Sequence, residues 1–316
     1  MPQEPLPYND YGSALRHRLG GRVQKLAIDA GLGCPNRDGT VAYGGCTFCC
    51  GEAFSPAYCR EAKSITEQID RALAFHHNRG RKSDIYIAYF QAGTNTHASI
   101  ERLEQLYCEA LTHPQISGII IGTRPDCIDS EKLQLLANLR QRYYVAVEYG
   151  IESVYDSTLR HVNRGHTFAD AVAAVADTKA LGIDVGAHFI LGLPAESRDD
   201  IIAGIDSINT LGLNAIKLHQ LQIYRHTAIA REWCEHPEDF LFGAPDAVER
   251  YVALIVDILR RLRPDTAIER FTSEAPRHML LHSPLGGLRP DMLRNAIVQQ
   301  MNTHGYRQGE LYNAEK

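Results

Sequence analysis

The sequence predicts an α/β fold, a partial (β/α)6 barrel of the TIM type with N-terminal and C-terminal extensions. Six strand-like segments alternate with helical segments between residues 22 and 222, and strand–helix units in series form a parallel sheet. Such a sheet is either open and doubly wound or curled into a partial barrel. Polar residues gather after each predicted strand, and in a barrel these positions converge on one rim, which indicates an active site there.

Past residue 222 the strand–helix rhythm changes. We therefore expect an N-terminal extension at residues 1–21, the barrel at 22–222, and a C-terminal extension at 223–316 that packs on the barrel. A chain of 316 residues is long enough for one large domain with such additions.

Composition narrows the class of protein. Hydrophobic residues make up 44% of the chain and charged residues 22%, which is ordinary for a soluble core. No apolar run approaches the roughly 20 residues of a membrane span, and no signal peptide is recognisable. The net charge of −5 argues against wholesale coating of nucleic acid, although it leaves room for a local basic patch. We expect a cytoplasmic protein with reduced thiols.

The strands are recognised by apolar, β-prone runs bounded by polar loops. The run Ile85–Phe90 is apolar on both faces, as a buried parallel strand should be. The six expected strands are residues 22–30, 85–90, 116–121, 143–149, 184–191 and 215–221.

The helices between them follow a 3.6-residue periodicity. Ser64 and Glu67 form a capping-box pattern, and residues 100–111 carry apolar side chains at helical spacing. We expect helices at 12–19, 64–78, 100–111, 130–140, 154–161, 167–181 and 197–211. In the C-terminal extension we expect helices at 244–262 and 291–301, a short strand at 267–271, a loop at 273–287, and a frayed last dozen residues.

The densest chemical signal is the stretch Cys34–Cys50, which holds four of the eight cysteines. Cys46 and Cys49 form a C-x2-C pair, and a loop turning at Gly44–Gly45 can bring Cys34 back to them. Three clustered thiolates without a nearby fourth suggest an iron–sulfur cluster with one iron left open. Half of a structural zinc site and a thioredoxin-like redox pair stay open as alternatives at this point, whereas disulfides are disfavoured.

Several motifs together resemble the radical S-adenosylmethionine (SAM) superfamily. They are the cysteine stretch, G-T-R-P-D-C at 122–127, E-Y-G-I-E-S-x-Y-D-x-T-L-x-x-x-N-R-G-H at 148–166, and H-F-I-L-G-L-P-A-E at 188–196. More narrowly, the chain resembles a bacterial group of predicted iron–sulfur oxidoreductases related to the radical-SAM domain of the Elongator catalytic subunit.

The resemblance implies two cofactors, a [4Fe-4S] cluster and SAM. Cys34, Cys46 and Cys49 would hold the cluster, with Cys50 as an alternative to Cys49. The open iron would chelate SAM, and an electron would break a carbon–sulfur bond, leaving methionine and a 5′-deoxyadenosyl radical that abstracts hydrogen from a substrate. The implied partners are an electron donor such as flavodoxin or ferredoxin and, by the Elongator analogy, RNA. A small metabolite or a peptide is the other substrate class.

The resemblance also suggests roles for residues after the other strands. Gln91, Thr94 and Asn95 would contact the SAM amino group, and the turn at Gly192 would contact SAM through its backbone. The remaining candidates are Glu148 for the ribose hydroxyls, Arg164 for the SAM carboxylate, His188 in the barrel near the cofactor, and Lys217, His219 and Cys127 near the substrate.

Each role has a structural alternative. Arg164 could form a loop salt bridge, Glu148 could be a structural carboxylate, His188 a core histidine, and Cys127 a packed, inert thiol. At the level of the whole chain, the alternative to an enzyme is a non-catalytic iron–sulfur or zinc protein in electron transfer or scaffolding.

Overall fold

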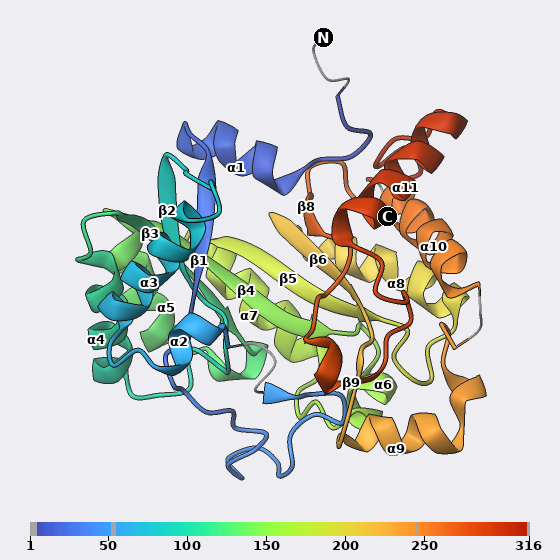
Figure 1. The fold of residues 1–316 in the computed structure, drawn as a ribbon, viewed down its shortest axis with the longest axis horizontal. Coiled ribbons are helices and arrows are strands. Elements are labelled where there is room, and N and C mark those ends of the chain that lie inside the picture. Colours follow the sequence, from blue (N-terminus) through green and yellow to red (C-terminus); the bar gives the residue numbers. More distant parts are fainter. Residues whose placement is uncertain (1–4, 52–54, 244–245, 315–316) are drawn as a thin grey trace.

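The computed structural model describes residues 5–51, 55–243 and 246–314, and its centre is one curled, parallel sheet (Figure 1). Seven strands follow each other in the order β1-β2-β3-β4-β5-β6-β8, and every neighbouring pair is parallel. Their bounds are β1 Val23–Ile28, β2 Ile85–Phe90, β3 Ile116–Thr123, β4 Tyr144–Glu152, β5 Asp184–Leu191, β6 Ala215–Gln220 and β8 Ala267–Arg270. The sheet is a half-barrel, so the predicted fold class is confirmed.

The helices lie around this sheet, mostly on its outer side, with α1 across one end (Figure 1). They are α1 Tyr11–Leu19, α2 Ala57–Arg60, α3 Ile65–His77, α4 Ile100–Leu111, α5 Ser130–Arg140, α6 Asp156–His161, α7 Phe168–Ala180, α8 Arg198–Thr210, α9 Ala228–Glu235, α10 Ala247–Arg261 and α11 Pro290–His304. A second, antiparallel pair is formed by β7 Ile223–Tyr224 and β9 Leu280–His282. Short 3-10 turns are η2 Pro125–Cys127, η3 Pro237–Asp239 and η4 Arg277–Met279.

The hydrophobic core lies mainly between the sheet and these helices. Ile119 and Ile121 of β3 face that side and are fully buried. Ile120 points the other way, into the barrel, where Leu15 of α1 joins its cluster. Fully burying a side chain of this size contributes about 1.5–3 kcal/mol. α1 therefore closes one end of the barrel with apolar side chains.

The C-terminal extension completes the sheet as well as packing on it. β8 pairs with β6, and Ile268 N also donates to Asn9 O at 2.8 Å. The sequence predicts a short strand here but does not predict its partner. The division of the chain into three parts stays a prediction.

Some expectations about the extension are wrong. The last residues are not frayed as far as the structure describes them, because Gly309 N and Leu311 N donate to Leu259 O and Arg260 O at 3.0 and 2.7 Å. The expected loop at 273–287 contains η4 and β9. The expected helix at 244–262 starts at Ala247, and residues 244–245 lie outside the described residues.

No helix in the described ranges is both long and apolar enough to cross a membrane.

Candidate active site

The cysteine loop leaves β1 at the carboxyl edge of the sheet, the edge where barrel enzymes carry their active sites. Its first turn closes when Arg37 N donates to Cys34 O at 2.8 Å, and a second turn closes when Cys49 N donates to Cys46 O at 3.0 Å. Gly45 has a φ of +79°, and its N donates to Asn36 O at 2.7 Å. The glycine reversal predicted here therefore folds the loop back on itself.

The three predicted cluster cysteines act on one guanidinium. Arg37 Nη2 donates to the backbone oxygen of Cys49 at 2.9 Å, and the pKa of Arg37 is raised, first by Cys49 and further by Cys34 and Cys46. Burial raises the pKa of Tyr224 to about 12, and the charges of both Cys50 and Cys49 raise it further. The ligands of a mononuclear zinc site lie close enough together to share one metal ion. Among the described residues, no three His, Cys, Asp or Glu side chains are arranged in this way.

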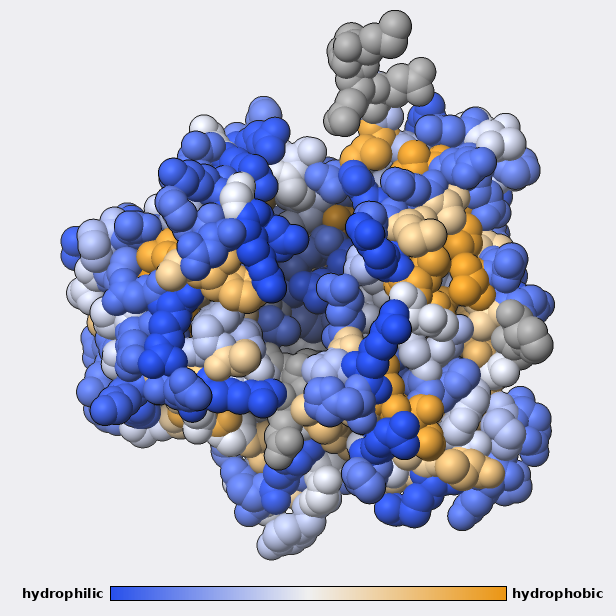
Figure 2. All heavy atoms as spheres, in the orientation of Figure 1, coloured by the Kyte–Doolittle hydropathy of each residue, from blue (hydrophilic) through white to orange (hydrophobic). Residues whose placement is uncertain are grey.

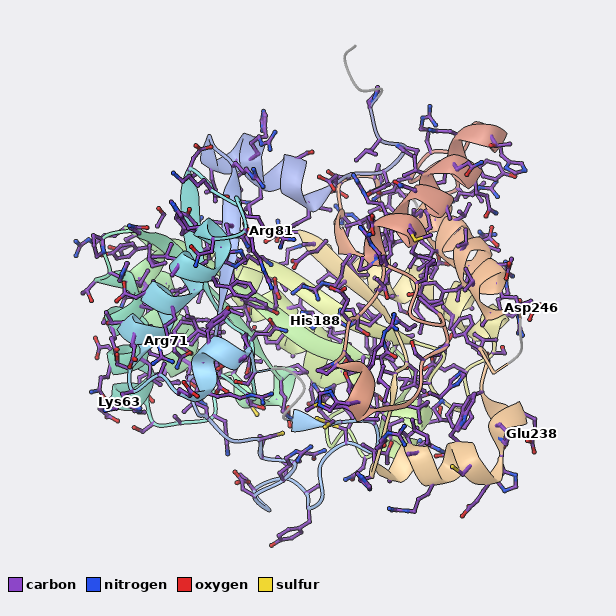
Figure 3. All side chains as sticks on the ribbon, in the orientation of Figure 1. Lys63, Arg71, Arg81, His188, Glu238 and Asp246 are labelled. Atoms are coloured by element: carbon purple, nitrogen blue, oxygen red, sulfur yellow. The ribbon has the colours of Figure 1, made fainter. Side chains whose placement is uncertain are left out.

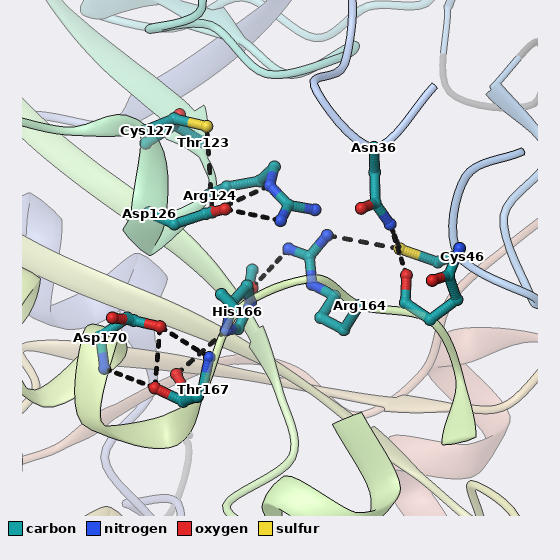
Figure 4. Close-up of polar contacts among 12 residues, drawn as sticks. Asn36, Cys46, Thr123, Arg124, Asp126, Cys127, Arg164, His166, Thr167 and Asp170 are labelled. Carbon is teal, nitrogen blue, oxygen red and sulfur yellow. Dashed lines mark hydrogen bonds and ion pairs between the residues drawn. The ribbon is translucent and has the colours of Figure 1, made fainter. Parts of the chain in front are cut away.

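Cys46 is the buried member of the set, and two side chains donate to it (Figure 4). Asn36 Nδ2 lies 3.5 Å and Arg164 Nη1 3.6 Å from Cys46 Sγ. Burial raises the pKa of the Cys49 thiol, and the neighbouring Cys46 raises it further. Such a thiol needs a metal centre or a fixed cation to become the thiolate that binds metals.

Several buried polar atoms beside Cys46 have no partner among the described residues. Asn36 Oδ1, Arg124 Nη1 and Arg164 Nε are of this kind, although the rest of the Arg124 guanidinium is paired with Asp126 at 2.8–2.9 Å. An unsatisfied buried polar group costs about 1–3 kcal/mol. The free donors and the three thiols fit a bound anionic cluster and a polar cosubstrate at this edge.

The loop after β2 packs directly against the cysteine loop. Thr94 N donates to Gly33 O at 3.1 Å. Asn95 Nδ2 donates to Phe90 O and Gly122 O at 3.0 and 2.8 Å, which leaves its buried Oδ1 without a described partner. Gln91 lines a cavity of about 330 Å³ beside the edge of β1. Of the three predicted SAM contacts, Asn95 can therefore offer only its oxygen.

The turn after β5 is shaped by Gly192. Its φ is +83°, and an added Cβ would lie 2.8 Å from the Phe242 ring. Phe242 of the C-terminal extension therefore packs against this turn. The extension also reaches the cysteine loop, because Ile229 N of α9 donates to Thr47 O at 3.1 Å.

Deeper in the barrel lies a cluster of four charged side chains, the barrel ion network, which consists of the buried Glu148 and Lys217 and the partly buried Lys25 and Glu269. Lys25 Nζ lies 2.6 Å from Glu148 and 2.5 Å from Glu269. Lys217 Nζ lies 2.5 Å from Glu148 and 3.2 Å from Glu269. Because Lys25 belongs to β1 and Glu269 to β8, the network joins the two edge strands of the half-barrel.

The network shifts the pKa of its members. Burial alone would raise the pKa of Glu148, but the ammonium groups of Lys217 and Lys25 bring it well below its usual range. Burial lowers the pKa of Lys217 to about 8 despite the neighbouring carboxylates. Lys217 Nζ also donates to the Tyr89 hydroxyl at 2.9 Å. Lys217 is therefore positioned to exchange a proton near neutral pH.

Two histidines stand beside the network. His188 lies at the centre of the sheet (Figure 3), beneath the hydrophilic hollow in the middle of Figure 2. Its Nε2 is 3.1 Å from Glu148, and its ring stacks on His219 at 5.5 Å. Burial and Lys217 lower the pKa of His188 to about 4, and burial followed by His188 lowers that of His219 well below its usual range. Both rings are therefore neutral at pH 7.

The structure thus sorts the predicted residues into two groups. The cysteines, Arg164 and the Gln91–Thr96 loop lie together at the edge, whereas Glu148, His188, Lys217 and His219 lie together in the barrel. Glu148 stands four residues before the end of β4, about 13 Å along the strand. Both of its oxygens already accept from cations, so the ribose role of Glu148 stays a prediction.

Cys127 lies beside the edge group, because Thr96 Oγ1 donates to Cys127 O at 2.7 Å. Its Sγ lies 3.8 Å from Asp126 Oδ1, and burial, with the charge of Asp126, raises the pKa of the thiol to about 12. At neutral pH Cys127 is a protonated thiol.

Sequence reasoning missed other members of the site. They are Lys25 and Tyr89 in the barrel, and Asn36, Arg37 and Arg124 around the cysteines. Their positions in the sequence could have identified these residues, because each lies on, or just after, a strand that is predicted to lead into the site.

Comparison with known proteins agrees with this geometry. The radical SAM superfamily model matches residues 31–208, and the model of the radical SAM C-terminal domain matches residues 213–302. The chain belongs to the radical SAM superfamily. Proteins of this family bind a [4Fe-4S] cluster and SAM.

Individual relatives confirm the narrower resemblance as well. The uncharacterized protein YtqA of Bacillus subtilis is 32% identical over 319 residues, covering 99% of this chain and 97% of the relative. Elongator complex protein 3 of Dictyostelium discoideum is 25% identical over 226 residues, covering 70% of this chain and 38% of the relative. The structure of Elp3 from the archaeon Methanocaldococcus infernus matches in fold, with a TM-score of 0.65 at 17% identity, over 90% of this chain and 64% of that one.

Proposed function

We propose that this radical SAM protein is an enzyme that reductively cleaves SAM and uses the radical to abstract hydrogen from a substrate. Cys34, Cys46 and Cys49 would hold a [4Fe-4S] cluster. The observation that carries the proposal is the geometry of the cysteine loop, in which Asn36 and Arg164 donate to Cys46 Sγ and Arg37 donates to Cys49 O. Bound together, the cluster and SAM supply a 5′-deoxyadenosyl radical.

The residues around the loop would hold the cofactors in place. Asn95 Oδ1 is a buried acceptor suited to an amino group. Arg124 Nη1 and Arg164 Nε are buried donors suited to a carboxylate. The Gln91–Thr96 loop and α9 each donate a backbone hydrogen bond to the segment that carries the cysteines and would shield it from two sides.

We place the substrate site in the barrel, beneath the hollow of Figure 2. Lys217 is the candidate acid or base there, because burial lowers its pKa to about 8 and a catalytic group works best with a pKa near the working pH. His219 offers a buried Nε2 without a described partner. Cys127, as a protonated thiol, is the candidate hydrogen donor.

Anaerobic reconstitution tests the proposal. The chain should bind iron and sulfide, and should produce 5′-deoxyadenosine from SAM when dithionite is added. The variant with Cys34, Cys46 and Cys49 all changed to Ala should do neither, whereas Cys59→Ala is a matched control outside the loop. If the wild type makes no more 5′-deoxyadenosine than the triple variant, the enzymatic proposal is wrong.

The same preparation separates the alternatives. Iron and sulfide without 5′-deoxyadenosine would indicate a non-catalytic iron–sulfur protein, and zinc without sulfide would indicate a structural zinc protein.

The resemblance alone supports the remaining parts of the proposal. These are a flavodoxin or ferredoxin as electron donor, RNA as substrate, and a cytoplasmic location. Comparing modified nucleosides and metabolites between a deletion strain and its parent would test the substrate class. Unchanged nucleosides beside an altered metabolite would exclude RNA.

A further inference from the structure

The segment after α6 binds the cysteine loop at several points. Thr47 N donates to Val162 O at 3.0 Å, and Asn163 Nδ2 donates to Gly45 O at 2.8 Å. Asn36 Nδ2 donates a hydrogen bond to Asn163 O and also contacts Cys46 Sγ. Residues 162–164 therefore fix the position of Cys46 and of the groups that donate to it.

Arg164 is itself fixed by β4. Its Nη2 donates to Gly150 O at 2.6 Å and lies 3.5 Å from Glu152 Oε1. An added Cβ at Gly150 would lie 2.8 Å from this Nη2, so only glycine lets the guanidinium approach so closely. With Nη2 held by the strand, Nη1 is directed at Cys46 Sγ, 3.6 Å away (Figure 4).

The two donors act in a buried setting. Asn36 is 0% and Arg164 7% exposed, whereas Arg37 beside Cys49 is exposed. Water and salt weaken the effect of an exposed charge far more than that of a buried one. The charge of Arg164 is therefore screened less than that of Arg37, and Asn36 adds a buried, uncharged donor to Cys46.

Hydrogen bonds to the cysteine sulfurs and the charge around them set the reduction potential of an iron–sulfur cluster. Reduction adds one electron and hence one negative charge, which a nearby cation and sulfur-directed donors stabilise. We propose that Arg164 and Asn36 are positioning residues that raise the reduction potential of the cluster through Cys46. This inference rests on the proposed function only in requiring that the cysteines hold a [4Fe-4S] cluster.

This role differs from the predicted pairing of Arg164 with the SAM carboxylate, and the two can be separated. A group that acts through Cys46 changes the potential of the cluster even without SAM. A group that only binds the carboxylate changes SAM affinity and leaves the SAM-free potential unchanged.

The experiment is a redox titration of the reconstituted full-length protein without SAM. Dithionite supplies the electron, and EPR follows the reduced cluster. Arg164→Met should lower the equilibrium constant for reduction of the cluster about tenfold. For a one-electron couple this makes the reduction potential about 59 mV more negative. Asn36→Leu should shift the potential in the same direction by less. Arg160→Met, a change at an exposed residue of α6 just before this segment, should leave the potential unchanged.

An Arg164→Met protein with normal iron content and an unchanged SAM-free potential would overturn the inference, as would a variant that loses only SAM affinity. If Arg164→Met cannot hold the cluster, Asn36→Leu provides the test instead. An unchanged SAM-free potential in Asn36→Leu would then overturn the inference. An unshifted potential in the variants beside normal 5′-deoxyadenosine formation by the wild type would refute this inference alone. A shifted potential without any 5′-deoxyadenosine would refute only the proposed function.

Discussion

Removing one charge from the barrel ion network should strongly destabilise the fold. Glu148→Gln keeps the shape of the side chain but leaves Lys25 and Lys217 with only Glu269 as a carboxylate partner. Glu148 and Lys217 are 4% and 3% exposed and Lys25 is 16% exposed, so the surplus positive charge is poorly hydrated. Breaking a buried ion pair by removing one partner costs about 3–5 kcal/mol, a large share of the roughly 5–15 kcal/mol that holds a protein folded.

Urea unfolding, followed by far-UV circular dichroism and by the fluorescence of the single tryptophan, Trp233, would measure this loss. Lys217→Met in the Glu148→Gln background restores the charge balance. The double variant should therefore lose less than the sum of the two single losses, by about 1–3 kcal/mol.

The exposed pair Arg289–Asp291, 74% and 57% exposed, is the matched control, and Asp291→Asn should change stability by less than about 1 kcal/mol. A loss below about 1 kcal/mol for Glu148→Gln, or strict additivity in the double variant, would refute the reasoning.

Three further outcomes are expected. His188 has a folded-state pKa of about 4 against about 6.5 when unfolded, so the unfolded chain binds more protons between these values. Stability should fall as pH drops through that window, by at most about 3 kcal/mol, and His188→Gln should flatten the fall in an acid titration of unfolding. Gly93→Ala would place a Cβ 2.4 Å from a backbone oxygen at a φ of +78°, and should cost about 2 kcal/mol or more in thermal unfolding; Gly286→Ala, with a φ of +58° but open space, should cost less. Cys49→Ala should lose most bound iron, whereas Cys50→Ala should keep it, and the reverse result would exchange their roles.

The six strands of the barrel could be predicted because each is a short, β-prone run bounded by polar loops. A central strand such as β3 is buried on both faces, whereas β1, at the edge, is only partly buried. The edge position of the cysteines followed from the same pattern, since Cys34 comes directly after the first strand. Side-chain identity along a strand, such as Lys217 two residues before His219, also indicated a shared inward face.

The network itself could not be predicted, because it depends on closure of the sheet. Lys25 and Glu269 are 244 residues apart in the chain and meet only when β8 joins β6. Asn36 has no signature of its own, and its contact with Cys46 arises from the two turns of the loop. Gln308 was missed for the same reason, although its side chain donates to Arg263 O and Thr266 O at 2.7 and 2.8 Å.

The placement of β8 has a consequence for the order of folding during synthesis. Domains fold from the N-terminal side as the chain emerges, and six strands are complete once residue 220 has been made. At that stage Lys25 and Lys217 share Glu148 as their carboxylate, because Glu269 has not been made. A surplus buried charge opposes compaction, so the nascent six-stranded sheet should stay hydrated and open. Once Glu269 has been made, its carboxylate balances the surplus positive charge. The seven-stranded half-barrel can then form in one cooperative step.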